Sequence, residues 1–172
     1  MRLHSNSLTG TLPDFGQNPN LETIEIGENL LSGTFDDILN LHLPPNLKVL
    51  DISSNPLFGG TLPNELGKQV SHLKELRASN CQISGTIISE IGLITGLQVL
   101  DLSMNDLRGN LPFVLSELKE LQMINLSDNN FSGALMAEIA NLKELKELNV
   151  ANNNFSGVIP DALTSLADHL GR

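Results

Sequence analysis

One pattern of hydrophobic and polar positions recurs along most of the chain. Its clearest copies begin at Leu97, Leu121 and Leu145, so the period is 24 residues. A fixed period of this size is typical of a solenoid, in which each repeat completes its core only by stacking on its neighbours. The pattern therefore predicts an elongated stack of repeats.

Each repeat combines two kinds of hydrophobic spacing. In residues 121–144, Ile124 and Leu126 lie two apart, which puts both side chains on one face of a strand. A strand this short is not stable alone, so we expect it to pair in parallel with its copies. Ile139 and Leu142 lie three apart, which suits a short helical turn. One continuous parallel sheet is predicted, with helical or irregular turns on the opposite side.

An asparagine follows the predicted strand in almost every repeat. Its side-chain amide can bond backbone groups that a buried bend leaves unpaired, and stacked copies would form a ladder of such bonds. The predicted ladder positions are Asn6, Asn29, Asn55, Cys81, Asn105, Asn129 and Asn153. At Cys81 we expect an inert, buried thiol that replaces one bond of the ladder, rather than a nucleophile.

The order LxxLxLxxN, followed by an apolar residue, a glycine and Leu-Pro or Ile-Pro, resembles the leucine-rich repeat family. The longer form in residues 105–112 and 153–160 is similar to the plant-type subclass of receptor-like kinase ectodomains and polygalacturonase-inhibitor-like proteins. This resemblance implies an α/β fold, a right-handed leucine-rich-repeat solenoid or horseshoe. Its concave side would be a parallel β-sheet and its convex side a series of short 3-10 or α turns.

The repeat boundaries predict one leucine-rich-repeat domain over residues 1–172. It consists of a partial repeat at 1–20, full repeats at 21–46, 47–72, 73–96, 97–120, 121–144 and 145–168, and a tail at 169–172. Because Met1 falls in mid-repeat, we expect a fragment of a longer solenoid whose open ends can make end-to-end contacts. The alternative is a true start with a frayed first repeat. Leu170 is expected to cover part of the last core layer.

Charge and cysteine content narrow the classes of partner. Lys and Arg number 10 against 20 Asp and Glu, and this net charge of −10 argues against nucleic acid or an anionic membrane. The single cysteine excludes an intrachain disulfide, and no apolar run reaches transmembrane length. We expect no direct membrane insertion by this segment. No signal peptide opens the chain, and only the resemblance favours the extracellular side of a membrane protein.

The predicted concave face carries the candidate binding residues. Its central row contains Glu25, Asp51, Arg77, Asp101, Asn125 and Asn149, and Val99, Met104 and Met123 form a candidate apolar patch beside Asp101. The row could dock a basic or amide-rich partner, since a concave solenoid face is the usual binding surface. Two alternatives stay open: the charges only solubilise the strands, and the apolar residues are singly exposed.

No motif in the chain suggests catalysis, a metal or a cofactor. The four histidines are scattered in the repeat frame, and no phosphate loop, dinucleotide fingerprint or nucleophile elbow occurs. We expect a non-catalytic scaffold that binds a protein or peptide ligand. The resemblance implies the recognition part of a larger receptor-like membrane protein in signal transduction. The alternative is a soluble enzyme inhibitor or assembly scaffold without a signalling role.

Overall fold

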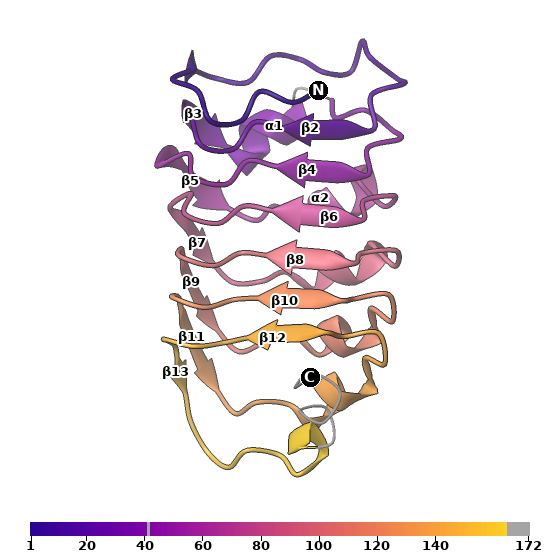
Figure 1. Ribbon diagram of the computed structural model, residues 1–172, viewed down its shortest axis with the longest axis vertical. Helices are drawn as coiled ribbons and strands as arrows, with labels where there is room; N and C mark the ends of the chain where they lie inside the picture. The colour runs from indigo at the N-terminus through magenta and orange to yellow at the C-terminus, as the bar shows by residue number, and fades with distance from the viewer. Residues whose placement is uncertain (41, 165–172) are drawn as a thin grey trace.

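The computed structural model describes residues 1–40 and 42–164. Successive repeats stack along one axis, with the N-terminus at one end and the last repeat at the other (Figure 1). The predicted solenoid is therefore confirmed. The proposed tail at 169–172, with Leu170, and the end of the last repeat lie outside the described residues.

The predicted parallel sheet lies along one side of the stack. Its strands are β2 (Thr23–Glu25), β4 (Val49–Asp51), β6 (Glu75–Arg77), β8 (Val99–Asp101), β10 (Met123–Asn125) and β12 (Glu147–Asn149). They pair in chain order, and the register aligns Leu76, Leu100 and Ile124. These central residues are buried while both flanking residues of each of these strands are partly exposed, as period-2 alternation requires.

A second parallel sheet, which the sequence reading did not anticipate, runs beside the first (Figure 1). Its strands are β1 (Thr9–Gly10), β3 (Leu30–Thr34), β5 (Leu57–Thr61), β7 (Ile83–Gly85), β9 (Asp106–Gly109), β11 (Asn130–Gly133) and β13 (Asn154–Phe155). Each forms just after the ladder position. In β11, Phe131 points into the core and Gly133 ends the strand with φ +81°, a conformation that glycine adopts without strain.

Short helices occupy the side opposite the first sheet. They are α1 (Phe35–Asn40), α2 (Leu66–Gln69) and the 3-10 helices η1 (Ser89–Leu93), η2 (Phe113–Glu117) and η3 (Ala137–Asn141). Their packing is close: a Cβ added at Gly67 would lie 1.9 Å from the carbonyl oxygen of Glu90. The core lies between these helices and the two sheets, and its layers share one type of residue, aliphatic with a few phenylalanines.

Buried hydrogen bonds connect consecutive repeats at the ladder positions. The Nδ2 group of Asn129 donates to the carbonyl oxygens of Leu102, Leu126 and Ser127 at 2.9, 3.3 and 3.1 Å. Its Oδ1 accepts the backbone N–H of Leu107 in the preceding repeat at 3.0 Å. Asn29, Asn55, Asn105 and Asn153 make the same kinds of bond. Asn6 is exposed, and its amide donates only to Leu3 and His4.

Cys81 supplies only half of the ladder chemistry. Its thiol donates to the carbonyl oxygens of Ile52 and Ser79 at 3.2 and 3.3 Å, but it has no oxygen to accept a backbone N–H from the preceding repeat. That repeat carries an extra residue after Asn55, and the N–H of Phe58 turns back to the carbonyl oxygen of Asn55 at 2.9 Å. A local bond thus replaces the one that Cys81 cannot accept.

Candidate functional site

The concave sheet brings the proposed polar row together. Register pairs Glu25 with Asp51, Asp51 with Arg77, and Arg77 with Asp101. The row continues through Asn125 and Asn149. Because neighbouring parallel strands lie about 4.8 Å apart, the six side chains form one continuous file. All six are partly exposed, so a partner on this face can reach them.

Four members of the row also stabilise the bend that follows their strand. The backbone N–H of Ser53 donates to Asp51 Oδ1 at 2.9 Å, and that of Ser103 to Asp101 Oδ1 at 3.1 Å. Asn125 and Asn149 accept an N–H two residues ahead in the same way. This role was not predicted, although an Asp-x-Ser or Asn-x-Ser spacing signals it in three of the four repeats; the fourth has Ala151 in place of the serine. These four side chains therefore stabilise the fold and also form part of the exposed concave surface.

Arg77 binds a carboxylate on its own strand. Its Nε and Nη2 lie 3.2 Å from Glu75 Oε2, two residues earlier on the same face. Within the row, its register neighbours are Asp51 and Asp101. The positive charge at the middle of the sheet is thus surrounded by carboxylates, and the concave face stays predominantly acidic.

The proposed apolar patch is only partly assembled. Val99 and Met123 are register partners on β8 and β10, between Glu75 and Glu147. Met104 lies beyond the end of β8, in the bend before the ladder position, where its φ is +55° and its N–H donates to Ser127. Its side chain is 57% exposed. The structure therefore joins Val99 to Met123 and places Met104 on the rim.

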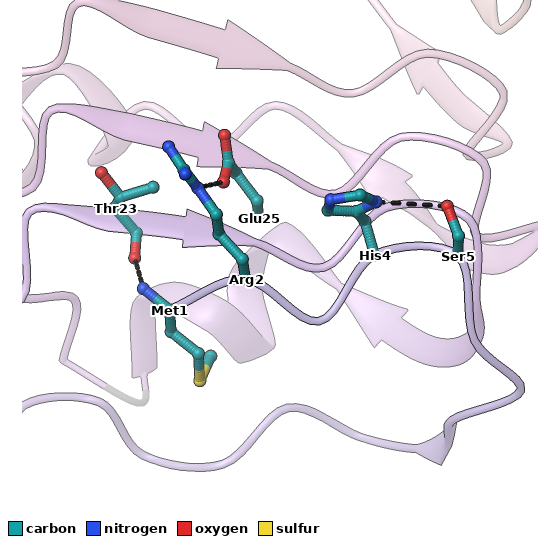
Figure 2. Close-up of polar contacts among 6 residues, drawn as sticks. All are labelled: Met1, Arg2, His4, Ser5, Thr23 and Glu25. Carbon is teal, nitrogen blue, oxygen red and sulfur yellow. Dashed lines mark hydrogen bonds and ion pairs between the residues drawn. The ribbon is translucent and has the colours of Figure 1, made fainter.

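The N-terminal repeats form a hollow of about 350 Å³ at the end of this face. Its lining consists of His4, Glu25, Gly27, Glu28, Asp51, Ser53, Ser54 and Ser79. Arg2 reaches Glu25 from the first repeat, while His4 turns toward Ser5 (Figure 2). The hydroxyl of Ser5 donates to Glu28, so this carboxylate has a neutral partner. The hollow is an acidic recess open to solvent.

Burial determines how reactive the thiol of Cys81 is. The residue is fully buried, and loss of hydration raises the pKa of its thiol from 9.0 to about 11. The nucleophilic thiolate is therefore scarce at neutral pH.

Among the described residues, no group of three or more His, Cys, Asp and Glu side chains is placed to hold a metal ion. Nor does any helix in residues 1–40 or 42–164 have the length and apolarity to cross a membrane.

Comparison with known proteins identifies the repeat. The sequence pattern of the Leucine Rich Repeat family matches residues 46–69, 72–93, 96–118, 120–142 and 144–166. Receptor-like protein 39 of Arabidopsis thaliana is 34% identical over 112 residues, covering 65% of this chain and 13% of that protein. Receptor-like protein 7 of the same plant is 36% identical over 121 residues, covering 67% and 11%. The chain thus spans about an eighth of these relatives.

Solved structures share the fold over nearly the whole chain. The ectodomain of the Arabidopsis receptor kinase HAESA, in complex with an N-terminally extended IDA peptide hormone, superposes with a TM-score of 0.86 at 34% identity. The match covers 94% of this chain and 27% of that one. The Arabidopsis thaliana GASSHO1/SCHENGEN3 ectodomain, in complex with CASPARIAN STRIP INTEGRITY FACTOR 2, gives 0.85 at 32% identity, covering 95% and 19%.

Proposed function

Because this chain belongs to the leucine-rich repeat family, we propose that it is the ligand-recognition segment of a larger receptor-like protein and binds a protein or peptide. The observation that carries the proposal is the unbroken concave file from Glu25 to Asn149, made of partly exposed polar side chains in register. A regular file of this kind offers an extended ligand repeated contacts at one spacing.

Two further observations support a binding role. Related leucine-rich-repeat ectodomains are non-catalytic binding domains, and the solved examples include complexes with peptide ligands. The core is contributed by every repeat, so concave side chains that do not bond the following bend, such as Glu25, Arg77 and Met123, can vary without loss of the fold. We propose that the contacts are Glu25, Asp51, Arg77, Asp101, Asn125 and Asn149, joined by Val99, Met123 and, at the rim, Met104.

Peptides selected from a random library against the immobilised chain test this function. Met123→Glu should fold, because Glu75 and Glu147 occupy the equivalent positions of β6 and β12. We expect it to weaken the selected peptides about tenfold, because it removes an apolar contact and puts in its place a carboxylate that a bound apolar side chain would desolvate. Phe113→Ser, on the helical side of the stack, is the matched control.

Equal binding by the parent chain, Met123→Glu and Phe113→Ser would contradict the concave assignment. Selection of no binding peptide would contradict the proposed binding function itself.

A receptor and a soluble inhibitor or scaffold differ in what accompanies this segment in the full protein. A receptor requires an apolar helix of about 20 residues elsewhere in the coding sequence, whereas a soluble protein does not.

A further inference from the structure

Two leucines on the second sheet face solvent although strands of this sheet elsewhere are polar on that side. Leu30 opens β3 and is 44% exposed, and Leu57 opens β5 and is 60% exposed. Their neighbours Leu31 and Phe58 point inward and are buried. Pro56, which precedes Leu57, is also exposed. This apolar rim, defined as Leu30, Pro56 and Leu57, lies outside the concave file.

The repeats themselves show that the fold does not require these leucines. In the four later repeats the residue directly after the ladder position is Gln82, Asp106, Asn130 and Asn154. All four are exposed on the same side of the molecule in strands or bends equivalent to those of Leu30. The same backbone position is thus occupied by polar residues in the four later repeats, and their strands and bends still form.

The register brings the two leucines close enough to act together. Leu57 pairs with Ser32 in the parallel ladder of β3 and β5, and Ser32 lies two residues beyond Leu30 on the same face. Standard strand geometry then places the Cα atoms of Leu30 and Leu57 about 8 Å apart, within reach of a single apolar side chain. The apolar rim is therefore one contact surface.

Charge decides what kind of segment fits this surface. Glu28 lies two residues before Leu30 and lines the acidic hollow together with Glu25 and Asp51. Arg2 binds Glu25, but Glu28 accepts its side-chain hydrogen bond from the neutral hydroxyl of Ser5. Lys48, just before the strand next to β2, is bound to Glu22 at 2.7 Å and so does not neutralise Glu28. An occupant of the rim thus meets uncompensated negative charge beside it.

We propose that the apolar rim and Glu28 together dock a basic polypeptide segment. Its aliphatic or aromatic side chain covers Leu30, Pro56 and Leu57, and an adjacent arginine or lysine reaches Glu28 at the mouth of the hollow. The inference rests on the proposed function and refines it. A ligand on the concave sheet would pass from its N-terminal strands onto the apolar rim, and the second sheet would supply part of the specificity.

The probe is a blocked peptide of sequence Gly-Arg-Leu-Leu-Arg-Gly, titrated into the isotope-labelled chain and followed by amide chemical shifts. We expect the largest shifts in β3, β5 and the bend at Glu28. Leu57→Asn, which installs the residue type of later repeats, should weaken binding about fivefold, since half of a leucine's burial is worth about 1 kcal/mol. Glu28→Gln should weaken it several-fold and also reduce its dependence on salt. Leu93→Asn, at an exposed leucine on the helical side, should leave binding unchanged.

Peptides with glutamate in place of arginine, or glycine in place of leucine, should bind clearly less well than the probe. Shifts centred on Val99 and Met123 instead of the rim would overturn this inference and leave the concave binding function standing. The absence of shifts at millimolar peptide would also overturn it, whereas the proposed function is judged separately by library selection. Equal affinity of Leu57→Asn and the parent chain would exclude the rim as a docking surface.

Discussion

Replacing Asn129 by alanine measures what one ladder residue contributes to stability. The substitution removes four hydrogen bonds, but it does not strand four groups. The carbonyl of Leu102 keeps its bond from Asn105 Nδ2, and that of Leu126 keeps its bond from Asn153 Nδ2. The carbonyl of Ser127 keeps the N–H of Met104. What remains without its side-chain acceptor is the buried N–H of Leu107.

The expected cost follows from that single donor. A buried polar group left without a partner costs about 1 to 3 kcal/mol, and the three weakened carbonyls place the value in the upper half of that range, near 2 to 3 kcal/mol. For a chain of 172 residues this corresponds to a fall in Tm of roughly 5 to 10 °C. Urea unfolding followed by far-UV circular dichroism measures it directly.

Cys81→Ala is the matched control at the same position of another repeat. The carbonyls that accept its thiol keep other donors: Ile52 has Asn55 Nδ2 at 2.7 Å, and Ser79 has the N–H of Ser54 at 2.7 Å. No donor is stranded, so the loss should be about 1 kcal/mol or less. If Asn129→Ala and Cys81→Ala cost the same, or if Asn129→Ala is neutral, the reasoning from acceptor loss is wrong.

Three further predictions concern close packing, the thiol and the extra residue. Gly67→Ala should cost more than about 2 kcal/mol in urea melts because its Cβ would overlap a carbonyl oxygen, whereas Gly96→Ala, with open space around it, should cost less than about 0.5 kcal/mol. Because the pKa of the Cys81 thiol is raised to about 11 in the folded chain, the unfolded thiol ionises first, and the free energy of unfolding should hold below pH 9 and fall between pH 9 and about 11. Cys81→Ala should lack this fall. At pH 8 the thiol of the folded chain should not react with Ellman's reagent. Deletion of Pro56 should destabilise by about 1 to 3 kcal/mol, and adding Cys81→Asn should recover most of the loss, because the restored register then finds a side-chain acceptor; strictly additive effects in this double-mutant cycle would contradict the coupling.

Hydrophobic period and spacing were sufficient to predict the stack and its concave sheet. Ile124 and its equivalents recur at one distance and alternate with polar neighbours, and a 24-residue period leaves few other ways to bury them. The second sheet was not predictable in the same way. A strand such as Asn130–Gly133 contains one buried residue, Phe131, and that is too short a pattern to distinguish a strand from a turn.

Side-chain partners depended on geometry that the repeat period does not encode. Arg77 lies between Asp51 and Asp101 in the row, as the sequence placed it, yet its ion pair is with Glu75 on its own strand. Met104 was grouped with Val99, but the bend preceding the ladder residue is left-handed in each described repeat and carries Met104 to the rim. Such turns are a property of the folded backbone and are only weakly signalled by residue type.

The concave row contains two members whose identity the fold alone does not explain. Asp51, Asp101, Asn125 and Asn149 each accept an N–H two residues ahead, which restricts those positions to short side chains with an oxygen at the δ position. Glu25 and Arg77 do not make this bond, and their strands are equally well paired. Since the backbone is formed without their help, the opposite charges of Glu25 and Arg77 are not required by the fold. The charged side chains of this face that the fold leaves unconstrained therefore lie in the N-terminal half of the stack, the same half that carries the acidic hollow and the apolar rim.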